Sequence, residues 1–282
     1  MVGPTKESEQ GTKDPIYEVP QKCPVCSFET FYAYRLLSKT QMISLDDLLM
    51  EVYEGIRGYK TVDYNKLKVI VCPRCFYASE RDSDFISLST SAIKREFKEM
   101  KHALKKDLNS EIETRKSLIE KYGLDGNSFG KDRDYKVAMV SYLLAALCSE
   151  IKAKFGVEKS HRDTGLYYLK AAKMGELAGE TVEEVDKLLY KTSDALKKSY
   201  EIEELDVNSL AEVFYLIIYA NLVSNRHDEA RTFLGHFDSY RRRLHNVQRK
   251  QGGVSTAKID NYYEKIRDVM YDFEVETEEE NY

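Results

Sequence analysis

The sequence carries two copies of one tetrapeptide, Cys23-Pro24-Val25-Cys26 and Cys72-Pro73-Arg74-Cys75, while Cys148 stands alone. Proline fixes φ inside each copy, which is typical of a tight turn. Two thiolates three residues apart on such a turn form one edge of a tetrahedron, and the second turn supplies the opposite edge. Zn²⁺ prefers this arrangement. We therefore predict a structural zinc site with four ligands: Cys23, Cys26, Cys72 and Cys75.

Other interpretations of these cysteines stay open. Iron uses the same four ligands, and only the greater availability of zinc favours zinc. Four reduced thiols or two disulfides are the structural alternatives, although a reducing compartment disfavours disulfides. A thioredoxin-like dithiol enzyme needs one such pair and gains nothing from a duplicate. Lys22 and Arg74 lie beside the cysteines, and we expect them to offset part of the thiolate charge.

Length and composition exclude several classes of protein. The chain has 282 residues and a formal net charge of -5, with enough apolar residues for a substantial core. The negative total disfavours a general nucleic-acid coat. The amino terminus lacks the apolar stretch of a signal peptide, and no apolar run reaches the roughly 20 residues that span a bilayer. We expect a cytoplasmic protein without membrane insertion.

The amino-terminal part has the pattern of a small β module. Residues 1–20 are polar and irregular, and we expect a flexible leader. Residues 21–84 are expected to form a zinc-ribbon-like metal-binding module that carries an insertion, because 45 residues separate the two tetrapeptides. The clearest strands are 31–37 and 66–71. Between them, Ser44 is expected to cap a short helix.

After Phe85 the apolar period changes from two to 3.6 residues, which indicates helices. Residues 85–133 are expected to form one connecting helix, capped by Thr90 or Ser91 and running to about Tyr122, and then a loop. The acidic segment 274–282 is expected to be a disordered tail. The region 134–273 is expected to be an antiparallel helical domain with helices from 134 and at about 162–178, 181–200, 207–225, 228–248 and 256–273.

Parts of two helix pairs resemble tetratricopeptide repeats (TPRs). In the stretch from Tyr219 to Ala230, an Asp-Glu-Ala run opens a second helix, and Asn225 stands where the repeat usually has Gly. Asn tolerates the left-handed conformation that this position requires. Gly165 and Ala172 take the small-residue positions of a second helix, and Gly165 and Ala230 lie 65 residues apart, near twice the 34-residue period. A plain helical bundle is the alternative.

The combination resembles the bacterial family called domain of unknown function 2225. The resemblance rests on the two Cys-Pro-x-Cys turns, here called knuckles, and on the stretch Val69–Ala78. It implies a zinc-binding module joined to TPR-like helices, and it implies no activity. The family usually has Gly after each knuckle, where this chain has Ser27 and Phe76. The predicted fold is therefore mainly α, with a small β zinc-ribbon-like module followed by a TPR-like array.

The sequence shows no recognisable arrangement of catalytic residues. The stretch Gly126–Asp132 resembles a phosphate-binding loop but is one residue short and lacks the Ser or Thr that ligates Mg²⁺. The five histidines form no HExxH pair. Cys148 lies on an apolar helical face, as an inert core thiol does. We predict no catalytic residue, no cofactor-binding residue other than the metal ligands, and no enzyme activity.

Three classes of function stay open. The favoured one is a protein-protein interaction scaffold or adaptor that binds a protein or peptide partner in the groove of the helical array. The second is a nucleic-acid-binding regulator that uses the ribbon and the basic helices. The third is a redox or metal-dependent enzyme, which needs the open coordination position that four cysteines do not leave. The candidate partner-binding residues are Tyr142, Tyr215 and Tyr219 for the groove, and Arg241, Arg242 and Arg243 for phosphate.

Overall fold

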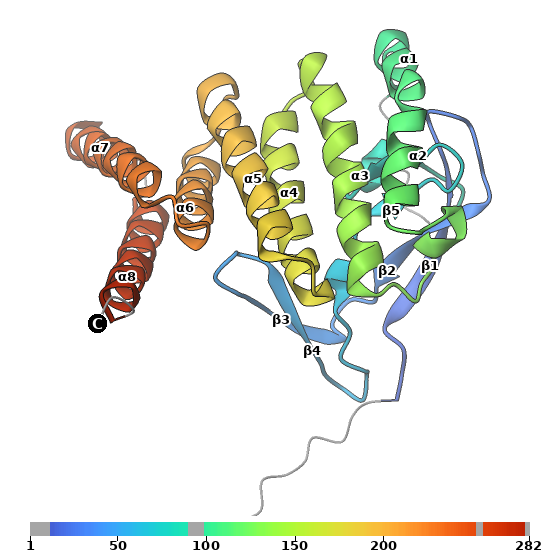
Figure 1. Ribbon diagram of the computed structural model, residues 1–282, viewed down its shortest axis with the longest axis horizontal. Coiled ribbons are helices and arrows are strands. Elements are labelled where there is room, and N and C mark those ends of the chain that lie inside the picture. Colours follow the sequence, from blue (N-terminus) through green and yellow to red (C-terminus); the bar gives the residue numbers. More distant parts are fainter. Residues whose placement is uncertain (1–11, 90–98, 252–255, 280–282) are drawn as a thin grey trace, which may run out of the picture. The chain divides into compact units, whose positions relative to one another are not determined.

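The computed structural model describes residues 12–89, 99–251 and 256–279, and it divides into two compact units. The first unit runs from Met1 to Cys148 and the second from Ser149 to Tyr282. Helix α3 (Tyr135–Lys154) crosses the division. Figure 1 shows strands and short helices in the first part of the chain and helices alone in the last part, so the fold is mainly α with a small β region.

Short antiparallel strands build the β region of the first unit. Strand β1 pairs with β2 on one side and β7 on the other, with Val19 opposite Ala33. Strands β3 and β4 form a hairpin, and β5 and β6 form a second small ladder. The bounds of the strands are β1 Ile16–Lys22, β2 Phe31–Leu36, β3 Gln41–Leu45, β4 Glu51–Gly55, β5 Ile70–Val71, β6 Ala78–Ser79 and β7 Ile86–Ser87.

The β3–β4 hairpin replaces the short helix that we predicted after Ser44. The Asp46 carboxylate accepts a hydrogen bond from the Met50 amide at 2.8 Å, and Leu49 adopts a left-handed backbone with φ of 56°. These features close a turn rather than begin a helix. The leucine spacing misled the prediction because Leu45 is exposed in the hairpin rather than buried on a helical face.

Two further predictions at the amino-terminal end need correction. The leader of residues 1–20 includes ordered chain, because Lys13 forms a bridge with Tyr59 and strand β1 begins at Ile16; residues 1–11 lie outside the described part. The predicted strand 66–71 is shorter than expected. The 3₁₀ helix η1 (Tyr64–Lys66) occupies its start, and only Ile70–Val71 pairs as β5.

The helices begin and end close to the predicted positions after residue 134. The single helix predicted up to Tyr122 is instead two helices that break at Glu111, and its expected caps, Thr90 and Ser91, lie outside the described residues. None of the described helices is long and apolar enough to cross a bilayer. The other bounds are α1 His102–Ser110, α2 Ile112–Lys121, α4 Ser160–Ala178, α5 Val182–Ile202, α6 Val207–Val223, α7 His227–Gln251 and α8 Ala257–Glu279.

The first unit extends well beyond the module that we predicted over residues 21–84. The Tyr142 hydroxyl, on α3, donates to the carbonyl of Asn65 at 2.8 Å, and the Arg133 guanidinium donates to the carbonyl of Val69 at 2.8 Å. These bonds join α3 and the preceding loop to the β region. Residues 85–133 are therefore part of the unit that carries the knuckles, and the division lies at Cys148 rather than at residue 84.

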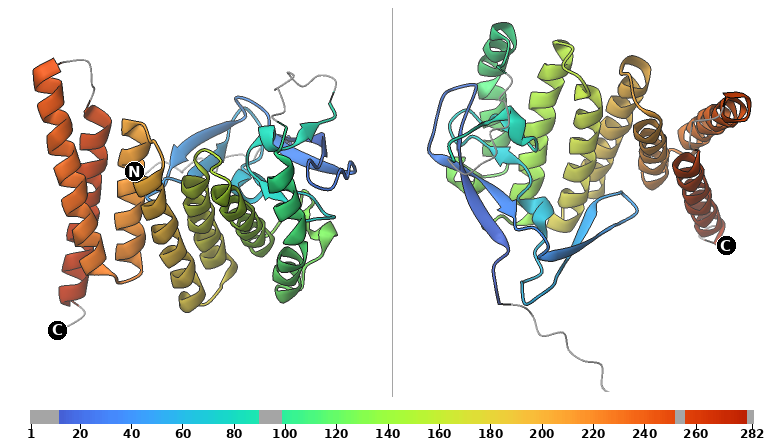
Figure 2. Two further views of the ribbon diagram at one scale, coloured as in Figure 1. Left: turned by 90° about the horizontal axis from the view of Figure 1, so that it is seen from above. Right: turned by 180° about the vertical axis from the view of Figure 1, so that it is seen from behind.

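Helices α4 and α5 form the tightest helix pair of the second unit. They run side by side in both views of Figure 2. Gly165 permits this approach, because a Cβ at that position would lie 2.6 Å from Cγ of Leu196. Thr181 caps α5 by accepting from the Glu184 amide at 3.3 Å. The prediction that Gly165 occupies a position that requires a small residue is confirmed.

Helices α6, α7 and α8 complete the second unit. The α6–α7 turn has Asn225 in the left-handed region with φ of 54°, as its position in the sequence predicted. The side chain of the buried Asn221 accepts from Arg226 at 2.7 Å and donates to the Ser193 hydroxyl at 3.0 Å, which ties this turn to α5. Helix α8 continues to Glu279, so the prediction of a disordered tail from residue 274 is wrong over 274–279.

Candidate functional site

Four sulfur atoms meet in the first unit. The Sγ atoms of Cys23 and Cys75 lie 3.6 Å apart, as do those of Cys26 and Cys72. All four Sγ atoms lie within 4.8 Å of one another. A metal–sulfur distance of about 2.3 Å places the corners of a regular tetrahedron about 3.8 Å apart. The cluster therefore has the dimensions of a four-thiolate metal site, as the two knuckles predicted.

The two knuckles have the same backbone geometry. The amide of Cys23 donates to the carbonyl of Phe28, and the amide of Ser27 donates to the carbonyl of Cys23. The second knuckle repeats both bonds five and four residues apart, from Cys72 to Tyr77 and from Phe76 to Cys72. Each knuckle thus projects two sulfurs from one rigid turn, and a metal would meet ligands that the chain has already positioned.

Burial and charge suit the cluster for a metal. Cys23, Cys72 and Cys75 are buried, while Cys26 is partly exposed, and all are free thiols. Hydrogen bonds from the neighbouring thiols, that of Cys23 first, lower the pKa of the Cys26 thiol. The same interactions act in the opposite direction elsewhere: hydrogen bonding with Cys26 raises the pKa of Cys23, and hydrogen bonding with Cys23 raises the pKa of Cys75. Deprotonation of all four thiols therefore needs a cation, and a bound divalent metal supplies that charge. The donor set fits zinc or iron.

Aromatic rings that follow the two knuckles in the sequence pack against one another. Phe28 stacks on Phe31, the Phe31 ring meets the edge of Phe85, and Phe85 packs against Tyr77 with ring centroids 5.3 Å apart. These rings follow or flank the two knuckles in the sequence. Phe31, Tyr77 and Phe85 are buried, so these rings form part of the apolar core of the first unit.

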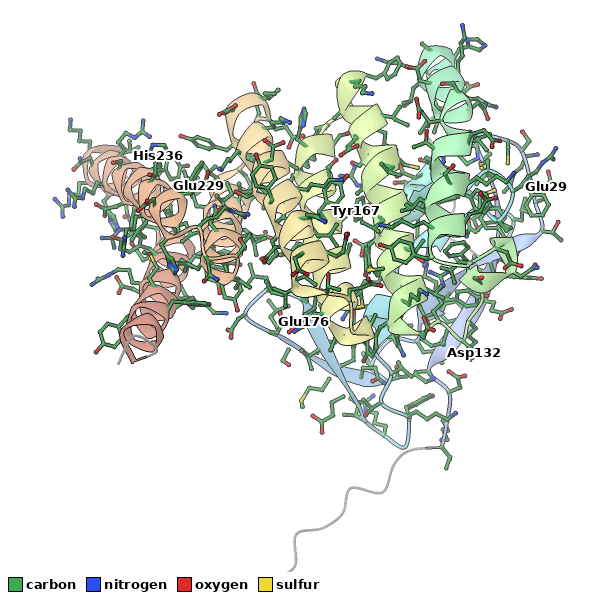
Figure 3. The ribbon with its side chains drawn as sticks, in the orientation of Figure 1. Glu29, Asp132, Tyr167, Glu176, Glu229 and His236 are labelled. Carbon is green, nitrogen blue, oxygen red and sulfur yellow. The ribbon has the colours of Figure 1, made fainter. Side chains whose placement is uncertain are left out.

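Neither cation expected beside the thiolates is buried with them. Lys22 forms an ion pair with Glu29 at 2.5 Å, and Figure 3 labels Glu29 in the loop after the first knuckle. Arg74 is exposed. The buried cation in contact with a knuckle is Arg115 of α2, which donates from Nε to the carbonyl of Cys75 at 3.1 Å. Sequence reasoning missed Arg115 because it lies 40 residues away on a helix whose buried face the periodicity alone does not fix.

The tyrosines that we proposed for partner binding do not form an exposed face. Tyr142 and Tyr215 are fully buried, and Tyr219 is partly buried. The ring of Tyr215 packs against Tyr262 of α8 at 5.5 Å and against Tyr219 at 6.0 Å. The expectation that Tyr142 and Tyr215 offer contact area to a partner is wrong, because neighbouring elements already cover them.

The predicted phosphate-binding arginines are largely engaged within the second unit. Arg241 forms ion pairs with Asp238 and Asp260 at 3.6 and 3.4 Å, and its guanidinium lies 4.0 Å from the ring centroid of Tyr263. Arg242 pairs with Asp238 at 2.6 Å. These carboxylates offset part of the positive charge of residues 241–250, a run that holds five Lys and Arg and no acid. Arg243 is exposed, and its guanidinium lies 5.9 Å from the ring centroid of Tyr240.

A separate cavity of about 500 Å³ lies in the second unit, where the end of α3 meets α4 and α5. Its acids are engaged: Glu150 accepts from the Tyr168 hydroxyl at 2.7 Å, and Asp194 pairs with Lys198 at 2.7 Å. Within the described chain, Lys154 has no ion pair, and Lys191 meets only the ring of Tyr168, at 4.9 Å. The cavity therefore combines free positive charge with an aromatic wall.

The sequence held a weak signal for this cavity. Its lining residues from α5 are two adjacent pairs that recur after four residues and one further residue, and they thus share one helical face. Periodicity does not say whether such a face is buried, solvated or part of a cavity. The α5 residues are Tyr190, Lys191, Asp194, Ala195 and Lys198.

The fold and the cluster define a class of protein: a chain with a four-cysteine centre in a small β region and a helical array after it. The family model described as an uncharacterized protein conserved in bacteria (DUF2225) matches residues 16–270. The chain belongs to this family. No curated protein and no solved structure matches it.

Proposed function

We propose that the protein is a non-enzymatic interaction protein of the cytoplasm, in which a structural zinc ion holds the first unit together and the TPR-like second unit binds a peptide. The observation that carries the proposal is the cavity of the second unit, with its free lysines beside an aromatic wall. A cavity of this size accommodates a few peptide side chains. The reducing environment of the cytoplasm keeps the four cysteines reduced and available to bind a metal.

The charge of the cavity selects the kind of peptide. Lys154 and Lys191 are exposed cations at its edge, and Tyr190, 57% exposed, offers a large contact surface with a polar tip. An acidic segment with one apolar or aromatic residue complements both features: carboxylates meet the lysines, and the apolar side chain meets the tyrosines. The proposed partner is therefore a protein that presents such a segment.

A non-enzymatic role follows from the coordination chemistry of the cluster. Four cysteine ligands complete a tetrahedral zinc site and leave no position for a substrate or a reactive water. When bound, the metal would supply folding energy by joining the two knuckles, which are separated by 45 residues of sequence. We therefore assign the centre a structural role.

Capture of the protein by immobilised hexapeptides tests the proposal. The array holds acidic hexapeptides and matched hexapeptides in which Asn and Gln replace Asp and Glu. The double variant Lys154→Glu, Lys191→Glu should lose capture of the acidic peptides, while the wild type keeps it. The matched control reverses two other exposed lysines without partners in the described chain, Lys106→Glu and Lys250→Glu. Equal capture of acidic and neutral peptides, or equal loss in both double variants, would contradict the cavity as the binding site.

The regulator that binds nucleic acid is the less favoured alternative. The ion pairs that Arg241 and Arg242 form within the second unit leave less free positive charge than the sequence run implies. A second basic stretch, residues 92–106, holds six Lys and Arg against two acids, and part of it lies outside the described residues. Binding of labelled single-stranded DNA to the protein tests this alternative. Binding that falls steeply as the salt concentration rises would support it.

A further inference from the structure

Arg115 is a buried cation that forms no ion pair within the described residues. Its side chain is 0% exposed, and no carboxylate in the described part of the chain forms an ion pair with it. Nε donates to the carbonyl of Cys75 at 3.1 Å, and one terminal nitrogen donates to the carbonyl of Leu108 at 2.6 Å. The other terminal nitrogen, Nη1, is buried and has no hydrogen-bond partner among the described residues.

An unpaired charge in a protein interior is costly, and the cost falls when an opposite charge lies nearby. Four thiolates and one divalent cation carry a net charge of about -2. The residue to which Arg115 donates is itself one of the four cysteines. The metal-loaded cluster is therefore the source of negative charge that this part of the interior offers to the guanidinium.

We propose that Arg115 is a positioning residue of the metal centre, which stabilises the four-thiolate form through its charge and holds the second knuckle through the carbonyl of Cys75. The guanidinium also reaches α1 through the carbonyl of Leu108, so the same side chain connects the centre to two helices. Groups that hydrogen-bond around metal ligands in this way commonly change metal affinity by about 10- to 100-fold when replaced.

A second buried arginine of the same unit provides a matched control. Arg133 donates from its three nitrogens to the carbonyls of Gly130, Val69 and Phe129 at 2.8–3.0 Å, and it bonds no cysteine. Burial lowers its pKa to about 10. Replacement of Arg133 therefore removes a buried guanidinium and its backbone hydrogen bonds without removing a contact with the knuckles.

The experiment measures zinc affinity by competition with a chromophoric chelator on the full chain carrying Arg115→Gln, Arg115→Lys or Arg133→Gln. Glutamine keeps a donor without the charge, and lysine keeps the charge. We expect Arg115→Gln to weaken zinc binding about 10- to 100-fold, Arg115→Lys to recover most of that loss, and Arg133→Gln to bind as the wild type does. Cobalt substitution, read by its thiolate charge-transfer absorption, confirms that the four ligands are retained.

The pH at which half of the zinc is released separates a charge effect from general damage. Loss of a nearby cation disfavours thiolates, so this pH should rise in Arg115→Gln and return in Arg115→Lys. Equal zinc affinity of Arg115→Gln and Arg133→Gln would overturn the proposal, as would an Arg115→Lys variant no better than Arg115→Gln. If Arg115→Gln fails to fold, Arg115→His against Arg133→His at about pH 8, where the imidazole is uncharged, provides the same comparison, and equal zinc affinities of that pair would again overturn the proposal.

Discussion

Ser27 and Phe76 occupy equivalent positions one residue after the two knuckles, and both adopt the left-handed backbone, with φ of 62° and 57°. Each donates its amide to the carbonyl of the first cysteine of its knuckle. The left-handed residue turns the chain back so that both sulfurs face the cluster. Gly adopts this conformation most easily, so the chain forms both turns with residues that carry a Cβ.

Replacement of Ser27 by Gly should stabilise the metal-loaded protein. A non-glycine residue in the left-handed region costs about 1 kcal/mol, and Ser27 is exposed, so no packing is lost. We expect Ser27→Gly to raise the free energy of unfolding by up to about 1 kcal/mol and Ser27→Val, which is β-branched, to lower it. Denaturant unfolding followed by circular dichroism measures both. A destabilised Gly variant would argue against the left-handed turn.

Close packing of Gly165 against Leu196 should be visible as energetic coupling. Gly165→Ala introduces a Cβ into the space of the Leu196 side chain, and overpacking of this kind costs about 1–3 kcal/mol. In a Leu196→Ala background the same change should be neutral or stabilising, because the space is free and Ala favours helix by about 1 kcal/mol. A double-mutant cycle from denaturant unfolding gives the coupling energy. Additive effects would contradict the contact.

Removal of the metal should loosen the first unit beyond the knuckles. Tyr142 and Arg133 join α3 and its preceding loop to the β region, and Arg115 joins α1 and α2 to the second knuckle. After chelation, hydrogen exchange should accelerate in the knuckles and in α1 and α2, while α4 and α5 keep their protection. Faster exchange confined to residues 21–84 would instead support the smaller module predicted from the sequence. A uniform increase in exchange rate along the chain would mean that the two units unfold together.

Acidification should release the metal and remove its contribution to stability. Metal binding needs thiolates, so protons compete with zinc, and affinity falls as pH falls. The stability due to zinc is present at neutral and higher pH and is lost progressively below it. Unfolding of the wild type and of Cys72→Ser should be measured from pH 8 to about pH 5. The difference between the two should shrink as pH falls, whereas a constant difference would contradict metal-linked stability.

The knuckles and the helices after residue 134 were predictable from local sequence, because ligand spacing and helical period are local properties. The β3–β4 hairpin was not, because Leu45 and Leu48 have helical spacing and the decisive turn depends on the Asp46 side chain. Burial of Tyr215 depends on α8, which is distant in the sequence. Arg115 escaped prediction for the same reason: a charged residue on a helix is normally solvated, and only the fold places this one against Cys75.

Elemental analysis of the purified protein tests the central claim most directly. With four Sγ atoms within 4.8 Å of one another, we predict one equivalent of zinc per chain, lost in Cys72→Ser. Cys148→Ala serves as the control, because Cys148 is a buried cysteine that does not belong to the cluster; it should keep the full equivalent. Wild-type protein without bound metal, or full retention of metal in Cys72→Ser, would contradict the four-cysteine centre.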